Sequence, residues 1–323
     1  MTISAINSLC RSYNIGYYYQ INRKKEEIMY RKILYLTAFE EFYLDILACI
    51  LNFKKVGAEE IVLVHVIHPT KLPMLQESLI FKLEDDLRAF LDAKMEDAVG
   101  IIEEAGMKAI KRIETGEPYL EILKVAKEEN VSLIVSGRER RGTFGEIFVG
   151  SLTDKIVRYG TIPVYIPKYP GVIGADKKTC ERFSQGLFTR ILYPTDWSDC
   201  AKTALRYLKG LKEAGVEEVI VAHIMDEKAM KLQSPEQFKE FQRIDFEKLA
   251  QLKDELESKG FKTNIRLSLG NPRADLITVA KKEDVSLIVL CTHGKGRVEG
   301  ILWGSVSRNV AEYSDRPVLL VKG

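Results

Sequence analysis

The sequence predicts an α/β fold built from two tandem, doubly wound (Rossmann-like) domains, each with a five-stranded parallel sheet in the order 3-2-1-4-5. Three observations lead to this prediction: the chain contains an internal duplication, strand and helix patterns alternate within each copy, and the strands are continuous aliphatic runs. Such runs are typical of parallel strands that are buried on both faces. The length of 323 residues fits two domains of ordinary size.

Two register shifts reveal the duplication. A shift of 154 positions places Gly304-Ser305 on Gly150-Ser151, and nearer the start of each copy a shift of 158 positions places Ile191-Leu192-Tyr193 on Ile33-Leu34-Tyr35. The four-residue difference falls in the middle helix region. Each copy is close to the commonest size of a single domain.

The duplication defines the expected domain boundaries. The first domain covers residues 29–168 and the second covers residues 189–323, with a linker at 169–188 between them. Residues 1–28 match nothing in the second copy and lack the continuous apolar stretch of a signal peptide. We expect them to lie outside both domains, either because translation starts at Met29 or because they form a disordered tail.

The second copy begins with a strand, a helix, a second strand and a long helix. Apolar residues at 191–193 and 218–225 predict the strands, and residues 199–214 and 235–259 predict the helices. The apolar residues of the long helix recur close to one face. They are Phe238, Phe241, Leu249, Leu252 and Leu256.

The remaining elements complete the alternation. A strand at 263–269 is followed by a helix at 272–282, a strand at 285–290, a helix at 305–313 and a final strand at 318–321. The copy is therefore expected to contain five strands and four helices. Pure alternation of this kind places helices on both faces of a parallel sheet.

The fold and one motif indicate the same place for a ligand. A doubly wound sheet binds ligands where the strand order reverses, here between the first and fourth strands. Those strands end at Pro194-Thr195-Asp196 and at Cys291-Thr292-His293-Gly294. Nine residues after Gly294, a helix begins at Gly304-Ser305-Val306-Ser307. Small residues at a helix start form a phosphate cradle, because their backbone N–H groups face the anion. We therefore expect a bound nucleotide.

These residues resemble the universal stress protein family in its ATP-binding branch. Gly294 and Gly304-Ser305 match the spacing of the family signature, with Cys291 where the first glycine is usual. The segment 190–198 resembles the family's opening strand and its nucleotide-contacting aspartate, Asp196. The resemblance covers both copies and implies a bound adenine nucleotide, ATP or AMP, with a divalent metal as an option alongside ATP.

The resemblance also implies a role for each residue of the site. Asp196 would accept hydrogen bonds from the ribose hydroxyls or the purine amine, and Ile224 would contact the base through its backbone. Gly294 would admit the phosphates close to the backbone, whereas the β-carbon of Cys291 would narrow that approach. The expected contacts are Pro194, Thr195, Asp196, Ile224, Cys291, His293, Gly294, Gly304, Ser305, Val306 and Ser307.

The first copy departs from this pattern. Ala38 stands where the second copy has Asp196, and Arg140 stands where it has Gly294. A bulky side chain at a position where the backbone must approach an anion argues against the same pose, although arginines can bind phosphate by charge. We expect this copy to be structural.

Composition excludes several other classes. The chain is 46% hydrophobic and 29% charged, as globular proteins are, and its net charge of +2 lacks the basic excess of a nucleic-acid-binding surface. No stretch approaches the roughly 18 apolar residues of a membrane span. The five cysteines show neither a metal-ligand pairing nor a disulfide pattern, so a cytoplasmic location is expected.

Several motifs have a second interpretation. Gly294-Lys295-Gly296 with Gly300 could be a dinucleotide fingerprint, but that motif belongs after the first strand of its βαβ unit. His65 and His223 lie at equivalent positions inside apolar strands and are interpreted as core residues with hydrogen-bond partners. Trp303 is interpreted as a packing residue, with adenine stacking as the alternative. Cys49 and Cys200, on the first helices, are expected in the core.

Two function classes remain, an adenine-nucleotide sensor and a slow ATPase or nucleotidyl transferase. Catalysis needs a positioned base and usually a carboxylate that holds a metal. The phosphate loop offers no acid except Glu299, whose spacing from the cradle is arbitrary. We expect a stress-related binding protein without catalytic residues, and hydrolysis that is slow at most. A purely structural protein would not need the second copy to keep Asp196.

The last strand of each copy predicts the assembly. The segments 162–166 and 316–321 each begin beside a proline, as edge strands do. An uncovered apolar edge invites pairing, and in the family that the chain resembles such strands pair between two domains. We expect an internal pseudo-dimer of the two copies, with a homodimer as a further option.

Overall fold

The computed structural model describes most of both repeats. The described residues are 29–37, 43–68, 77–137, 139–141, 146–168, 186–294 and 303–323. Residues 1–28, Ala38, Lys295, Gly296, Glu299, Gly300 and most of the linker lie outside this set, so the expectations for them stay predictions.

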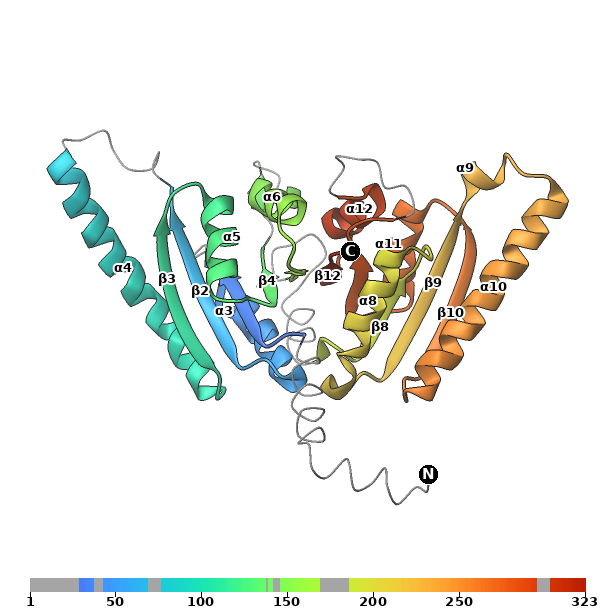
Figure 1. Cartoon of the computed structure of the whole chain (residues 1–323), viewed down its shortest axis with the longest axis horizontal. Coiled ribbons are helices and arrows are strands. Elements are labelled where there is room, and N and C mark those ends of the chain that lie inside the picture. Colours follow the sequence, from blue (N-terminus) through green and yellow to red (C-terminus); the bar gives the residue numbers. More distant parts are fainter. Residues whose placement is uncertain are drawn as a thin grey trace, which may run out of the picture.

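The strands of both repeats form one ten-stranded sheet (Figure 1) in the order β10-β9-β8-β11-β12-β7-β4-β1-β2-β3. The first repeat supplies β1 (Lys32–Leu36), β2 (Glu60–Ile67), β3 (Lys108–Thr115), β4 (Leu133–Val135) and β7 (Val164–Ile166). The second supplies β8 (Arg190–Pro194), β9 (Glu218–Asp226), β10 (Thr263–Gly270), β11 (Leu287–Cys291) and β12 (Val318–Val321). Neighbouring strands within each repeat are parallel, which confirms the predicted α/β class of tandem Rossmann-like domains.

Two details differ from a pair of simple parallel sheets. A two-stranded antiparallel hairpin, β5 (Glu139–Arg141) with β6 (Glu146–Phe148), follows β4 in the first repeat. The two sheets are also continuous, because β12 pairs with β7 in antiparallel orientation. The complete sheet is therefore mixed.

The junction between the repeats is short and apolar. Three residues of β12 lie opposite three residues of β7, with Leu319 opposite Tyr165 at the centre, and all six side chains are fully buried. The pairing covers the edge that each five-stranded sheet would otherwise expose.

Helices cover both faces of the sheet, and the long helices α4 and α10 stand on its two outer flanks (Figure 1). The first repeat contributes α3 (Tyr43–Ile50), η1 (Leu51–Val56), α4 (Glu77–Glu104), α5 (Pro118–Glu128) and α6 (Ser151–Tyr159). The second contributes α8 (Asp199–Lys209), η3 (Lys212–Ala214), α9 (Glu227–Met230), α10 (Pro235–Ser258), α11 (Pro272–Lys282) and α12 (Ser305–Tyr313). The helix predicted at 199–214 is interrupted at Gly210, because glycine is a poor helix former.

Buried apolar side chains form two layers, and each layer contains residues of both repeats. An aromatic cluster in one layer joins the repeats. The ring of Tyr30 lies 5.9 Å from that of Tyr207 in the second repeat, measured between ring centroids. Beside them, the ring of Phe53 lies 5.4 Å from that of Tyr165 and 5.1 Å from that of Phe188. The Tyr30 hydroxyl donates a hydrogen bond to the carbonyl of Tyr207 at 2.9 Å. The repeats therefore share a core as well as a sheet.

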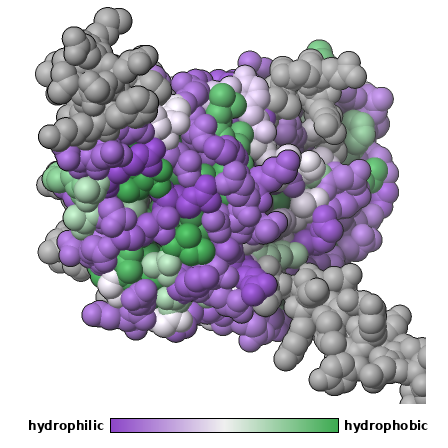
Figure 2. Space-filling view, turned by 60° about the vertical axis from the view of Figure 1, so that its left-hand side comes forward, coloured by the Kyte–Doolittle hydropathy of each residue, from purple (hydrophilic) through white to green (hydrophobic). Residues whose placement is uncertain are grey.

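Hydrophilic residues dominate the face on which the first repeat comes forward, with hydrophobic side chains gathered in smaller areas between them (Figure 2). Large apolar side chains of this repeat that are more than half exposed include Phe90, Leu120 and Tyr159. Within the described ranges, no helix combines the length and the apolar character needed to cross a bilayer.

Candidate functional site

A cavity of about 750 Å³ lies at the carboxyl ends of β8, β9 and β11, next to the start of α12. All eleven residues predicted for the site line it. The other lining residues are Ala201, Ala222, His223, Met225, Asp226, Met230, Phe241, Ile244, Asp245, Lys248, Pro272, Leu276 and Leu290. The structure therefore brings the predicted residues together where the sheet topology places a ligand.

The start of α12 supplies the expected backbone donors. The first intrahelical bond runs from the Arg308 N–H to the Gly304 carbonyl at 3.0 Å, so the amides of Ser305 and Val306 precede it and have no partner within the helix. The Ser305 side chain is exposed beside them. These groups, at the positive end of a helix dipole, can bind an anion.

Two of the predicted contact residues, Gly304 and Ser307, hold the loop in shape. The Gly304 N–H donates to the Thr292 carbonyl at 2.7 Å, and the Ser307 hydroxyl donates to the same oxygen at 2.9 Å. The Gly304 amide, which was expected to face the phosphates together with those of Ser305 and Val306, thus has a partner within the protein. Its proton is already used to tie the end of β11 to the start of α12.

Two glycines allow parts of the site to approach closely. A β-carbon on Gly294 would lie 2.5 Å from Oδ2 of Asp196, and one on Gly304 would lie 3.0 Å from the Thr292 carbonyl oxygen. Real β-carbons do not approach other atoms at 2.5 Å. The glycine at 294 therefore lets the loop after β11 lie against the carboxylate after β8.

The Asp196 carboxylate is held in a defined orientation. Its Oδ1 accepts hydrogen bonds from the Ser198 amide at 3.1 Å and from the Ser198 hydroxyl at 2.6 Å. The same hydroxyl accepts from the Ala201 amide at 3.1 Å and so caps α8. Because Oδ1 is held in this way, Oδ2 is directed toward Gly294.

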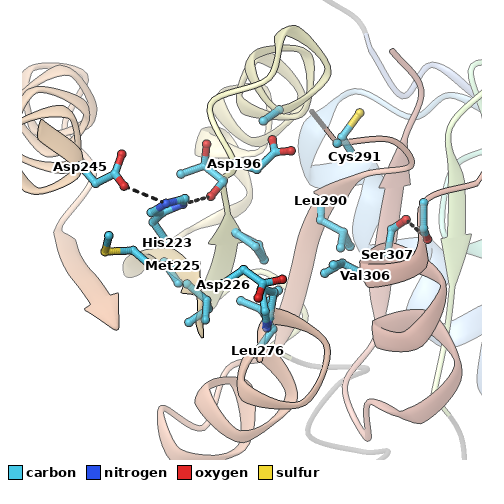
Figure 3. Close-up of a pocket in the computed structure, with 18 of the residues that line it drawn as sticks. Asp196, His223, Met225, Asp226, Asp245, Leu276, Leu290, Cys291, Val306 and Ser307 are labelled. Atoms are coloured by element: carbon cyan, nitrogen blue, oxygen red, sulfur yellow. Dashed lines mark hydrogen bonds and ion pairs between the residues drawn. The ribbon is translucent and has the colours of Figure 1, made fainter. Parts of the chain in front are cut away.

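The sequence did not predict that His223 lines the cavity. Its Nδ1 lies 2.7 Å from the Thr195 carbonyl, which can only accept, so Nδ1 carries a proton. Its Nε2 lies 3.2 Å from Oδ2 of Asp245 on α10, and Figure 3 shows the two side chains joined beside Asp196. His65 makes the equivalent contact, 2.7 Å to the Thr37 carbonyl. Both histidines have partners as predicted, but the role of His223 in the cavity wall was missed.

One end of the cavity is largely apolar. Ile224 and Met225 come from the end of β9 and Leu276 from α11. Figure 3 shows Leu290 and Val306 across from Leu276, with the Asp226 carboxylate beside Leu276. An apolar wall with a few polar groups suits the flat face of a base. Apart from Ile224 and Val306 these apolar residues were not predicted, because their periodicity is that of ordinary core residues.

The cysteines differ from the expectation. Cys200 on α8 and Cys291 at the end of β11 form a disulfide, with Cα atoms 5.7 Å apart. Their separation of 91 residues gave no pattern in the sequence. They meet because the first turn of α8 lies against the end of β11, and Cys291 keeps 9% of its surface exposed at the cavity wall.

Three further expectations concern Trp303, the first repeat and a metal site. Trp303 is 97% buried in an apolar cluster and does not line the cavity, in agreement with a packing role. In the first repeat, the backbone of Arg140 lies in β5, opposite Ile147 of β6. Within the described part of the chain, no group of three or more His, Cys, Asp or Glu side chains could hold a metal.

The doubly wound sheet with a ligand cavity at its switch point defines the class of protein, and comparison with known proteins gives the family. A model of the universal stress protein family matches residues 29–168 and 187–322, so the chain belongs to this family.

A universal stress protein of Methanocaldococcus jannaschii is 34% identical over 155 residues, covering 42% of this chain and 96% of the relative. The protein YxiE of Bacillus subtilis, also a universal stress protein, is 28% identical over 148 residues, covering 42% of this chain and 100% of the relative. The crystal structure of a universal stress protein from Archaeoglobus fulgidus is similar over 91% of this chain and 98% of that protein, with 26% identity and a TM-score of 0.68.

Proposed function

We propose that the second repeat binds one adenine nucleotide, ATP or AMP, and that the protein acts as a stress-related sensor or regulatory binding protein in the cytoplasm. The observation that carries the proposal is the cavity itself. Its wall combines an oriented carboxylate, helix-start amides that have no partner within the helix, and a largely apolar end. A nucleotide has matching parts, namely ribose hydroxyls, phosphates and a flat base.

The proposed pose follows from these walls. The phosphates lie at the amides of Ser305 and Val306, next to Gly294 and His293, and the ribose or purine amine donates to Asp196. The base lies against Ile224 in the apolar end. Pro194, Thr195 and Cys291 complete the wall, and Gly304 and Ser307 support the cradle through the Thr292 carbonyl. A divalent metal would accompany the phosphates of ATP.

Only the second repeat is proposed to bind nucleotide. The first domain (29–168) is then a structural partner in an internal pseudo-dimer with the second (189–323), joined by the linker 169–188. The shared sheet and the shared aromatic cluster support this assembly. A homodimer of the whole chain is a further option.

Calorimetric titration of the intact chain with ATP and with AMP tests the proposal. One site per chain is expected. Asp196→Asn should weaken ATP, AMP and adenosine alike by roughly 1 to 3 kcal/mol, because each loses a charged hydrogen bond. Asp199→Asn is the matched control, since its side chain is 95% exposed three residues further on. Unchanged affinities for Asp196→Asn, or two equivalent sites, would refute this assignment.

The second candidate is a slow ATPase or nucleotidyl transferase. The observation in its favour is the carboxylate of Asp196, whose Oδ2 lies close to the loop of Gly294. We expect turnover far below the common enzymatic range of about 1 to 1000 per second. Phosphate release from ATP with a divalent metal measures it. Several turnovers per second that disappear in Ser305→Ala would favour the enzyme.

A further inference from the structure

The disulfide between Cys200 and Cys291 connects the two walls of the cavity. Cys200 is the second residue of α8, and Cys291 is the last residue of β11 and itself lines the cavity. Ala201, next to Cys200, also lines the cavity. The disulfide therefore lies at the cavity wall and not at a distant surface.

On the α8 side, the bond reaches the carboxylate of the site. Ser198, the cap of α8, holds Oδ1 of Asp196 at 2.6 Å and accepts from the Ala201 amide in the same turn as Cys200. A shift of the first turn of α8 would therefore move the group that orients Asp196.

On the β11 side, the bond reaches the phosphate cradle. Cys291 precedes Thr292, whose carbonyl accepts from the Gly304 amide at 2.7 Å and from the Ser307 hydroxyl at 2.9 Å. Both donors belong to the start of α12. The disulfide therefore links the element that orients the carboxylate to the element that presents the amides.

We propose that Cys200 and Cys291 are a reversible oxidation site in the wall of the cavity, and that the oxidised chain binds adenine nucleotide more tightly than the reduced chain. This inference rests on the proposed function. The physical reason is preorganisation, because a covalent link between the two walls lowers the cost of ordering them around the ligand.

The reaction partner is a small dithiol or its cyclic disulfide. In reduction, a thiolate of the dithiol attacks Sγ of Cys200, and Sγ of Cys291 leaves as a thiolate and takes up a proton. The second thiol of the reagent then displaces Cys200, so the protein gains two electrons and two protons while the reagent becomes a cyclic disulfide. Oxidation is the reverse exchange.

Reduction has a steric consequence at this position. Bonded sulfur atoms lie about 2.0 Å apart, whereas non-bonded heavy atoms need about 3.5 to 4.0 Å. The C-terminal backbone lies directly on Cys200, because a β-carbon on Gly323 would be 2.5 Å from its Sγ. Cys200 therefore has little room toward the C-terminal backbone, and movement of Cys291 away from Cys200 shifts the end of β11, which carries the cradle.

The test measures nucleotide affinity and the reduction equilibrium on the intact chain. In buffers of dithiothreitol and its cyclic oxidised form, mass spectrometry of joined tryptic peptides 191–202 and 283–295 gives the oxidised fraction, and calorimetry gives the affinity for ATP. Oxidation should tighten binding at least about fivefold, the lower end of usual couplings between sites. By linkage, saturating ATP should then lower the reduction potential of the disulfide by about 20 mV. This is the fivefold affinity ratio converted for a two-electron couple, in which a tenfold ratio corresponds to about 30 mV.

Two variants test whether the redox dependence of ATP binding comes from the Cys200–Cys291 pair. Cys200→Ala should bind ATP like the reduced chain in both buffers. Cys49→Ser changes a buried cysteine on α3 of the first repeat, outside the cavity lining, and should keep the redox dependence. A disulfide that only stabilises the fold would leave the affinity unchanged.

Three results would overturn the inference. Equal ATP affinity of the oxidised and reduced chains refutes it while leaving the proposed function intact. Absence of the joined peptides in oxidising buffer refutes the site itself, whatever the affinity. Absence of ATP and AMP binding in both states refutes the proposed function and, with it, this inference.

Discussion

The geometry of the cavity depends on a few individual side chains and on the absence of a side chain at one glycine. Asp196 is held by Ser198, His223 by Thr195 and Asp245, and Gly294 leaves room for the carboxylate that faces it. Each of these contacts is made within the protein before any ligand arrives. The site is therefore largely preformed, which keeps the ordering cost of binding low.

At this scale, Gly294→Ala should weaken nucleotide binding at least tenfold. The new β-carbon would lie 2.5 Å from Oδ2 of Asp196, so the carboxylate or the loop must move. Titration with AMP measures the loss. Gly137→Ala is the matched control, because among the described residues beyond its chain neighbours no atom lies within 4 Å of its added β-carbon, and its affinity should equal that of the unchanged chain. Equal affinities for both variants would show that the close approach is not needed.

The sequence predicted the polar residues of the site better than their partners. Asp196, Gly294 and Ser305 follow from strand ends and from a spacing, which are local features of the chain. Asp245 and Cys200 contribute through contacts with residues 22 and 91 positions away, which only the folded sheet brings together. Such pairings leave no periodic pattern.

Among the elements, the long helix α10 has the least obvious part in the site. It was expected to pack on the sheet, and Leu249 and Leu256 are indeed buried, but Phe241 is 39% exposed and lines the cavity. Asp245 ties the helix to β9 through His223. The helix therefore forms an outer wall of the cavity as well as a cover of the sheet.

Asp245→Ala should weaken nucleotide binding by about 1 to 2 kcal/mol, because the Nε2 of His223 loses its carboxylate and the imidazole no longer holds the Thr195 carbonyl as firmly. Asp254→Ala, at an exposed position of the same helix, is the control and should bind normally. Calorimetry of both variants decides this. A loss that is equal in the two variants would indicate a general effect on α10.

The Ser234 cap of α10 gives a prediction on stability. Its hydroxyl accepts from the Gln237 amide at 3.2 Å, and the Gln237 side chain accepts from the Ser234 amide at 2.9 Å. Ser234→Ala removes half of this capping box and should lower the free energy of unfolding by about 1 kcal/mol. Urea denaturation measures it, with Ser258→Ala at the other end of the helix as the control. A difference below about 0.3 kcal/mol between them would contradict the capping role.

Helix boundaries were predicted closely where a residue in the sequence favours a helix start or end. Pro272–Lys282 and Ser305–Tyr313 coincide with their predicted ranges, since both helices begin at residues that suit a first turn. The helix after β8 was predicted too long, because Gly210 ends it while buried apolar residues continue at Leu211 and Ala214. The hairpin β5–β6 was not predicted, because β5 consists of charged residues and β6 is only three residues long.

On the scale of the whole molecule, the repeats are joined by more than their linker. The sheet continues from β12 to β7, the aromatic cluster spans both repeats, and Lys322 near the C-terminus donates to the Val157 carbonyl of α6. Burial at this boundary lowers the pKa of Lys322 to about 8, from an ordinary value of 10.5. The contact makes the junction sensitive to pH.

The direction of the pH dependence follows from the number of protons that Lys322 binds in the folded and unfolded chains. Between pH 8 and 10.5 the folded chain has lost this proton while the unfolded chain still binds it, so stability rises with pH in this window. Relative to Lys322→Met, the unchanged chain should gain roughly 2 to 3 kcal/mol of unfolding free energy from pH 7.5 to 10.5. Lys259→Met, an exposed lysine, should show no such difference. Parallel pH profiles for the chain and Lys322→Met would contradict the assignment.

The antiparallel strand pair at the centre of the sheet has a consequence for how the protein responds to its own abundance. Between separate chains, an interface made of this strand pair and the core around it would form to an extent that depends on the chain concentration. Within one chain each strand meets its partner at an effective concentration of roughly millimolar order, set by the tether alone. Pairing is thus a unimolecular event, so the cavity keeps the same shape in a cell that holds few copies and in one that holds many.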